Sequence, residues 1–212
     1  FVSYYAIARW GLNEWPVKVF PGLPPFVSTG IGVITVILLS MVTCAILAFT
    51  IERVAYKPLR NAPRIAALIT AIGVSFFLEY FGALNFVFTS NFITYKRPFD
   101  VVNWVISRTG ITTLTAGEAP PDGTIIFSNI SLVIIIASLL LVFILNYLVQ
   151  KTRTGKAMRA TAYDKPTSRL MGINVDGIIS ITFAVGASLA GAAGLLYATA
   201  FPQVYFVMGI IP

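Results

Sequence analysis

Four long apolar stretches run through this chain of 212 residues and restrict its fold more than any other feature. They cover residues 26–51, 65–88, 125–150 and 177–200, and Glu79 is the one charged residue inside them. A helix needs about 20 mostly apolar residues to cross roughly 30 Å of hydrocarbon. Each stretch therefore predicts one spanning helix, and the predicted fold class is all-α, a polytopic transmembrane helical bundle.

The composition agrees with a membrane protein and excludes several kinds of site. Hydrophobic residues make up 57% of the chain and charged residues 11%, too apolar a balance for a water-soluble domain of this size. The chain has no His and a single cysteine, Cys44, so a Cys/His zinc cluster and an intrachain disulfide are both excluded. We name no catalytic residue and no metal ligand, and we expect Cys44 to fill apolar space inside the first stretch.

Both ends of the chain are apolar, and it starts with Phe1 instead of Met. We interpret the sequence as an internal fragment of one transmembrane domain covering residues 1–212. Residues 1–8, FVSYYAIA, then represent the end of a fifth spanning helix that begins upstream.

The loops between the apolar stretches differ in charge. Loop 52–64 carries four basic residues against Glu52, and loop 151–176 carries six against two aspartates, whereas segment 89–124 is balanced. Cytoplasmic loops collect Lys and Arg, so we place the two basic loops inside and segment 89–124 outside. Because these clusters flank spanning helices, we do not expect them to bind nucleic acid. One interpretation of loop 52–64 is a topological anchor that meets lipid head groups.

Loop 151–176 is too long for a simple helix connection, which usually takes about 2 to 8 residues. Its segment YDKPTSRLMGIN predicts a short helix. Asp164 can accept a hydrogen bond from a first-turn N–H, Pro166 is tolerated in the first turn, and Gly172 can take the left-handed closing conformation. Two interpretations stay open: an amphipathic turn lying on the bilayer, or a docking helix for a cytoplasmic partner.

The second apolar stretch places small and polar residues four apart, with Ser75 and Glu79 among them. A carboxylate within a membrane is costly and normally faces the bundle interior or a water-filled cavity. Ser75 and Glu79 are therefore candidates to line a translocation path. The alternative is that Glu79 serves a structural hydrogen-bond network or lies near the outer interface.

The fourth stretch carries small residues at a spacing of four, which lets transmembrane backbones approach closely. These candidate helix-packing residues are Gly186, Ala190 and Gly194, followed by Ala198. The third stretch has few small or polar residues, so we expect it to face lipid. In the outer segment, TAGEAPPDGT predicts turns and VVNWVIS predicts a strand or a partly buried loop.

Two long strings of this sequence closely resemble the permease family of the branched-chain amino-acid ABC importers. They are IERVAYKPLRNAPRIAALITAIGVSFFLE and TRTGKAMRATAYDKPTSRLMGINVDGIISITFAVGASLAGAAGLLYA, and the resemblance covers essentially the whole chain. IERVAYKPLR and the segment from GKAMRA to LMGIN are its most specific parts. Family members are longer at both ends, in agreement with a fragment.

The resemblance implies a role for loop 151–176 as the coupling segment, a short helix that sits in a groove of the ATPase subunit. The generic importer motif begins with Glu-Ala-Ala, whereas this chain has Tyr163-Asp164-Lys165 near that place. The coupling candidates are Gly155, Arg159, Asp164, Pro166, Arg169, Leu170 and Gly172.

The resemblance further implies a permease subunit that imports leucine, isoleucine and valine by alternating access. Its partners would be two ATP-binding subunits, a second homologous permease and an extracytoplasmic substrate-binding protein, in the plasma (inner) membrane of a bacterium or archaeon. The sequence lacks a G-x-x-x-x-G-K-[ST] loop. We therefore expect ATP and Mg on the partner ATPase and no enzymatic activity or cofactor on this chain.

Three alternatives stay open. Members of the same family carry urea or other amides. The chain could instead belong to an ATP-independent secondary transporter or channel, which a broken helix or paired charges within the membrane would favour; the sequence shows neither. A purely structural membrane subunit is the third alternative.

Overall fold

The fold is described from a computed structural model that covers residues 2–12, 15–19, 24–84, 93–94, 103–107, 110–114, 125–201 and 203–204. Helices dominate it. The α-helices are α1 (Val2–Ala8), α2 (Trp15–Val19), α3 (Pro25–Ile51), α4 (Arg64–Ala83), α5 (Asn129–Lys151), α6 (Arg153–Tyr163), α7 (Lys165–Leu170) and α8 (Val175–Ala200). A π-helical turn, η1 (Glu52–Tyr56), and a 3₁₀ turn, η2 (Pro58–Asn61), connect α3 to α4.

Four of these helices, α3, α4, α5 and α8, are long and apolar enough to cross a membrane. They contain 27, 20, 23 and 26 residues, so each meets the length that about 30 Å of hydrocarbon requires. The prediction of four spanning helices in an all-α polytopic bundle is confirmed. The large apolar side chains of α5, such as Leu139 and Phe143, are exposed on the chain, as expected for a helix that faces lipid.

Two predicted helix boundaries were wrong. Residues 125–128 form a strand, and α5 begins only after Ser128, whose side chain accepts a hydrogen bond from the Ile130 N–H at 3.3 Å. Ser128 therefore acts as the N-cap, and the apolar residues before it pair with another strand. The second helix ends at Ala83, where Leu84 adopts an extended conformation, and residues 85–88 of the predicted span lie outside the described residues.

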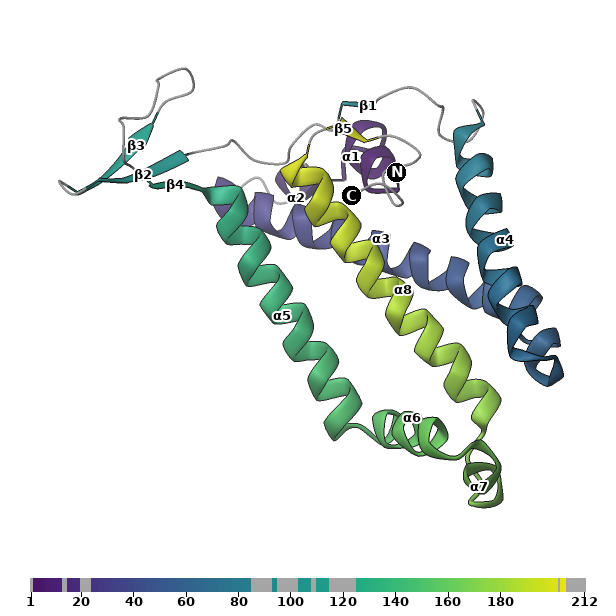
Figure 1. The fold of residues 1–212 in the computed structure, drawn as a ribbon. Coiled ribbons are helices and arrows are strands. Elements are labelled where there is room, and N and C mark those ends of the chain that lie inside the picture. The colour runs from purple at the N-terminus through teal and green to yellow at the C-terminus, as the bar shows by residue number, and fades with distance from the viewer. Residues whose placement is uncertain are drawn as a thin grey trace.

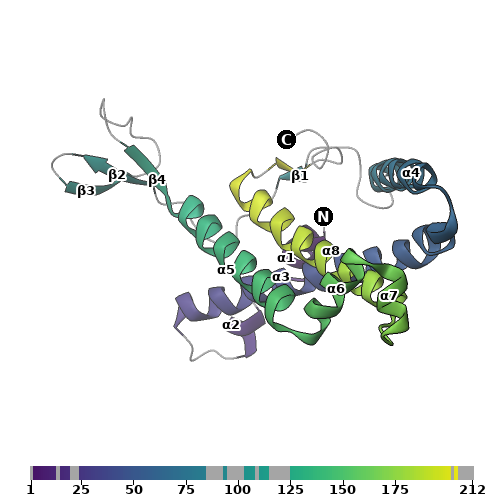
Figure 2. The same ribbon diagram turned by 60° about the horizontal axis from the view of Figure 1, so that its bottom comes forward.

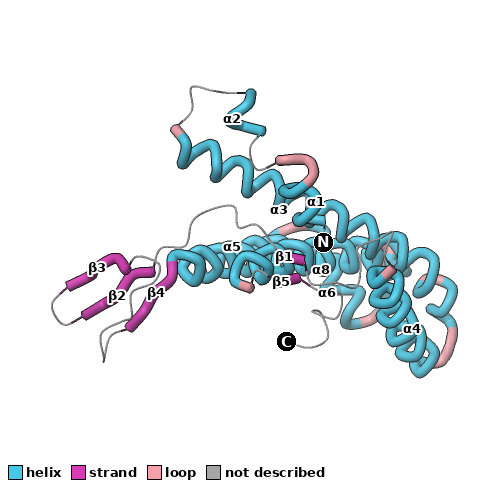
Figure 3. The backbone as a smooth tube through the Cα atoms, turned by 90° about the horizontal axis from the view of Figure 1, so that it is seen from above, coloured by secondary structure: helices cyan, strands magenta, loops and turns pink. Residues whose placement is uncertain are grey.

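The helices cross at large angles instead of forming a tight parallel bundle (Figure 1). α3 crosses α8, while α5 and α8 are joined at one end by α6 and α7. In Figure 2, where the bottom of the view in Figure 1 is turned forward, α6 and α7 lie in front. The view from above in Figure 3 shows α4 standing apart from α5, and its main contacts in the described part of the chain are with η1 and η2.

The contact between α3 and α8 is the most extensive one between described helices and contains the buried core. Gly191 allows the close approach: a Cβ built there would lie 2.9 Å from the Ser40 carbonyl oxygen and 3.0 Å from the Cys44 Sγ. The Ser40 hydroxyl donates to the Gly191 carbonyl oxygen at 3.1 Å. Cys44 thus fills space at a helix contact. The surrounding core residues come from three helices: Ala6, Ile7, Val36, Leu195 and Ala198.

Three residues of the predicted packing stripe make no close contact among the described residues, and their packing role stays a prediction. A Cβ added at Gly186 or Gly194 would meet no described atom within 4 Å, and Ala190 is exposed. Among the described residues, Gly191, one position beyond Ala190, makes the close contact with α3. A shift of one residue turns a helical side chain by about 100°, so Gly191 and Ala190 face different directions. Ala198 of the same predicted stripe is buried in the core.

Short strands gather at the end of the helices opposite α6 and α7 (Figure 1). β2 (Asn103–Ser107) pairs antiparallel with both β3 (Gly110–Leu114) and β4 (Ile125–Ser128), and Trp104 lies opposite Thr113 and Phe127. β1 (Ile93–Thr94) pairs with β5 (Gln203–Val204). The segment VVNWVIS therefore contains a strand. The predicted turns over residues 115–124 lie outside the described residues.

Candidate functional site

The connection from α5 to α8 is built from two helices, of which sequence reasoning identified only the second. α6 begins at a sharp elbow, where the Thr152 hydroxyl accepts a hydrogen bond from the Gly155 N–H at 3.0 Å. A Cβ at Gly155 would overlap the backbone carbonyl oxygens of Leu148 and Val149. Only glycine permits this close approach of α6 to the end of α5, so Gly155, predicted as a coupling residue, sets the direction of α6.

α6 is amphipathic and lies across the ends of the spanning helices (Figure 1). Gly155 and Thr161 are buried, whereas Lys156 and Tyr163 are exposed. The predicted coupling residue Arg159 is exposed and donates to the Gln150 side-chain oxygen at 2.6 Å. The N-capping Thr152 was the signal in the sequence that could have revealed this helix.

The predicted short helix in loop 151–176 is confirmed as α7, with Pro166 in its first turn. Gly172 has φ +81° and ends it in the left-handed conformation, as predicted. The Gly172 N–H donates to the Arg169 carbonyl oxygen and the Ile173 N–H to the Ser168 carbonyl oxygen, both at 3.0 Å. These two bonds form the Schellman closing motif, which satisfies the last carbonyls of a helix.

The start of α7 differs in one detail from the prediction. The Asp164 side chain precedes the helix, but it accepts its hydrogen bond from the Thr167 hydroxyl and not from a first-turn N–H. The Ser168 hydroxyl donates to the Asp164 carbonyl oxygen at 2.7 Å. The Thr167 hydroxyl thus donates to the carboxylate in place of a backbone N–H of the first turn.

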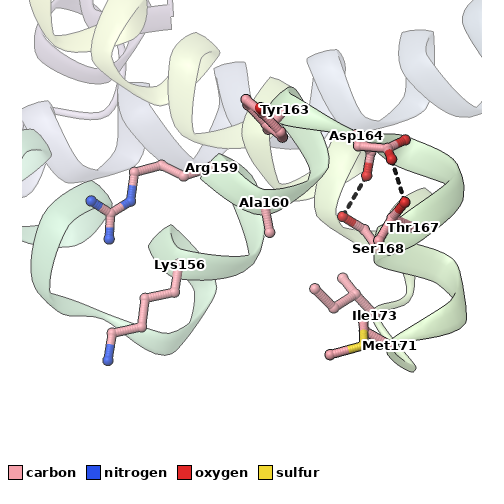
Figure 4. Close-up of a pocket in the computed structure, with 9 residues that line it drawn as sticks. All are labelled: Lys156, Arg159, Ala160, Tyr163, Asp164, Thr167, Ser168, Met171 and Ile173. Atoms are coloured by element: carbon pink, nitrogen blue, oxygen red, sulfur yellow. Dashed lines mark hydrogen bonds between the residues drawn. The ribbon is translucent and has the colours of Figure 1, made fainter.

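α6, α7 and the residues next to them line an open groove of about 620 Å³ (Figure 4). Figure 4 shows Lys156 and Arg159 on the α6 side of this groove and Met171 with Ile173 at the α7 end. The lining residues come from both helices and the turn between them: Lys156, Arg159, Ala160, Tyr163, Asp164, Thr167, Ser168, Met171 and Ile173. Two of the seven coupling candidates, Arg159 and Asp164, therefore line one site.

The groove is flanked by apolar side chains that nothing in the described chain covers. Tyr163 is 95% exposed, Leu170 87% and Met171 79%. α7, which carries Leu170 and is followed directly by Met171, lies beyond the ends of the spanning helices (Figure 1). Exposed apolar side chains of this kind suit contact either with a protein partner or with the membrane surface.

A chain of charged groups connects this site to the turn between α3 and α4. Arg60 pairs through one guanidinium nitrogen with Glu52 and through the other with Asp176 at the start of α8. Arg169 of α7 approaches the same Asp176 oxygen at 3.5 Å. These contacts place loops 52–64 and 151–176 on the same side of the helices, in agreement with the topology predicted from charge. Sequence reasoning counted these residues only as loop charges and missed their pairing.

The two candidates for a translocation path both lie on α4. Ser75 is exposed, and Glu79 is partly buried. The Glu79 Oε2 atom is shielded from solvent and has no hydrogen-bond partner among the residues that the structure describes. The role of both residues stays a prediction.

Four apolar spanning helices, with two basic loops on one side, define a multi-pass membrane protein. The chain belongs to the family of branched-chain amino acid transport system permease components, because a sequence model of that family matches residues 1–211.

Three curated relatives illustrate the similarity. The high-affinity branched-chain amino acid transport system permease protein BraD of Pseudomonas aeruginosa is 32% identical over 99% of this chain and 61% of its own length. LivH of Escherichia coli K12, a permease protein of the same description, is 33% identical over 81% of this chain and 52% of its own length. LivH of Salmonella typhimurium is 33% identical over 76% of this chain and 49% of its own length.

The chain thus spans about half to three fifths of the length of these relatives. The search of solved structures found no significant match.

Proposed function

We propose that the protein is the permease subunit of an ATP-driven importer for leucine, isoleucine and valine. Family membership and the printed descriptions of BraD and LivH support this substrate class. The positive-inside rule and the basic loops support a cytoplasmic position for α6 and α7. The membrane is then the plasma membrane of a bacterium or archaeon, and segment 89–124 faces an extracytoplasmic substrate-binding protein.

The observation that carries the ATP-driven part of this proposal is the exposed apolar edge of α7. Tyr163, Leu170 and Met171 lie at or beside an open groove, and the described chain leaves all three largely exposed. A short helix closed at its C-terminus and fixed against α6 presents these side chains in one geometry. That arrangement suits docking into a partner surface far better than lying flat on a bilayer.

In the assembled importer, residues 151–176 transmit force from the ATPases. Two ATP-binding subunits hydrolyse ATP with Mg on their own chains, and their closure moves α7. A second homologous permease completes the pore, which changes its open side. Ser75 and Glu79 of α4 are the residues of this chain that we place along the path.

Affinity purification of the full-length protein from its native membrane, with mass spectrometry of the co-purifying chains, tests the assembly. We expect two Walker-motif ATPases and a second permease. Reconstituted complexes should then take up labelled leucine only with ATP, and isoleucine and valine should compete whereas urea should not. Purification of the chain alone or as a homo-oligomer, under conditions that keep known complexes intact, would favour a secondary transporter instead.

A further inference from the structure

The most deeply buried charged side chain in the described residues is Glu52, at 0% exposure. It lies in the π-helical turn η1, where the Lys57 N–H donates to the Glu52 carbonyl oxygen at 2.8 Å. Both carboxylate oxygens have partners: Oε1 pairs with Arg60, and Oε2 accepts the Ser180 hydroxyl at 2.5 Å. A buried carboxylate is tolerated only with such complete pairing, so its position is fixed from two sides.

Arg60 bridges two carboxylates in this arrangement. Its side chain is 18% exposed, and its two terminal nitrogens bond different carboxylates, Nη2 that of Glu52 and Nη1 that of Asp176. The planar guanidinium presents donors in a fixed fork, whereas the ammonium of lysine is a single point of charge on a flexible stem. Lysine at this position would keep the charge but could not hold both carboxylates in the same geometry.

The connection continues along α8 and to α7. Asp176 lies in the first turn of α8, and Ser180 lies one turn further along. The ring centroids of Tyr56 in η1 and Phe183 in α8 lie 5.3 Å apart, which adds an apolar contact next to the charges. On the other side, Arg169 of α7 approaches Asp176. The inner ends of α3 and α8 and the short helix α7 therefore meet at one cluster of charges.

We propose that Glu52, Arg60 and Asp176 are positioning residues that hold the inner ends of α3 and α8 together at the point where Arg169 of α7 joins them. A push on α7 then moves both spanning helices together, so that ATP hydrolysis produces transport. This inference rests on the proposed function, because it needs an ATPase that moves α7. A buried ion pair adds little net stability compared with apolar residues, but removal of one partner is costly, so the pair fixes geometry.

The test compares Arg60→Lys with Arg53→Lys in the complete importer, reconstituted with its binding protein in vesicles. Both variants make the same chemical change, arginine to lysine. Arg53 is an exposed neighbour in η1 and has no ion pair within the described part of the chain, so its replacement breaks no bridge. The measured quantity is the number of ATP molecules hydrolysed per leucine imported. A purely structural defect lowers the number of intact complexes and reduces both rates in proportion, which leaves this ratio unchanged.

We expect Arg60→Lys to raise the ratio about two- to thirtyfold, the range by which changes along a coupling network act. Arg53→Lys should leave it at the wild-type value. An unchanged ratio in assembled Arg60→Lys complexes would overturn the inference while leaving the proposed function intact. If the wild-type vesicles show no ATP-driven uptake, the proposed function fails and the link fails with it.

Asp176→Asn provides a second variant in case Arg60→Lys does not assemble, because Asp176 is 48% exposed and tolerates the change better than Glu52. It should raise the same ratio. In the double variant, the two effects should not add, since both remove one shared bridge. Full additivity, or a wild-type ratio in Asp176→Asn, would overturn the link.

Discussion

The Ser180 hydroxyl donates to the buried Glu52 carboxylate at 2.5 Å, although 128 residues separate the two in the sequence. This bond joins α8 to the turn that follows α3, and it satisfies the one Glu52 oxygen that Arg60 does not reach. The inner ends of the two helices that form the core are thus held by a polar contact as well as by apolar packing.

Ser180→Ala should destabilise the protein by about 1.5–3 kcal/mol, the usual value of a hydrogen bond to a charged group. The apparent melting temperature of the purified protein in detergent measures the effect. Ser188→Ala is the matched control, because the Ser188 hydroxyl bonds only the Val185 carbonyl of its own helix at 2.7 Å. Equal shifts in the two variants would contradict the role given to Ser180.

Gly191→Ala should separate α3 from α8, because the new methyl group would lie 2.9 Å from the Ser40 backbone oxygen. Overpacking of this kind costs about 1–3 kcal/mol. Gly186→Ala on the same helix should have little effect on the permease purified by itself, since it meets nothing within 4 Å in the described chain. A larger loss of thermal stability from Gly186→Ala than from Gly191→Ala would show that the contact is placed wrongly.

Gly172→Val should prevent co-purification with the ATPase while the amount of protein in the membrane fraction stays normal. Valine at φ +81° carries a strain of about 1–3 kcal/mol, which opens the end of α7. Gly172→Asn is the milder comparison, because asparagine enters the left-handed region more readily. Normal co-purification and normal transport in Gly172→Val would exclude α7 as the docking element.

Glu79→Gln should raise the KM for leucine uptake by about tenfold or more if the carboxylate meets the amino group of the substrate, since a bond to a charged group contributes about 1.5–3 kcal/mol. The Oε2 atom has no hydrogen-bond partner in the described chain, so its capacity to accept a hydrogen bond is unused there. Tyr80→Phe, at the exposed neighbouring position, should leave the KM unchanged. Unchanged uptake kinetics in Glu79→Gln would assign Glu79 a structural role.

Local patterns predicted the features that depend on local chemistry. The four spanning helices follow from their apolar composition, and the limits of α7 follow from Asp164, Pro166 and Gly172, whose effects act within one turn. The run Ile125-Ile126-Phe127 was predicted as helix but forms a strand. A short apolar run is compatible with either structure, and only its pairing with β2 decides between them.

Features that depend on distant contacts could not be predicted. Gly186 and Gly191 are both small residues of α8, and only the position of α3 decides which one faces a neighbouring backbone. The bridge from Arg60 to Asp176 joins residues 116 positions apart. Charge counting placed both on one side of the membrane but could not pair them.

The most direct test of the docking role places a photo-crosslinking amino acid at Met171 in the assembled importer. This side chain is 79% exposed at the end of α7, beside the groove. Leu139, 65% exposed in the middle of α5, is the control position. We predict a covalent product with an ATP-binding subunit from Met171 and none from Leu139. Products with lipid alone from Met171, in complexes that contain the ATPase, would contradict the claim that α7 is its docking helix.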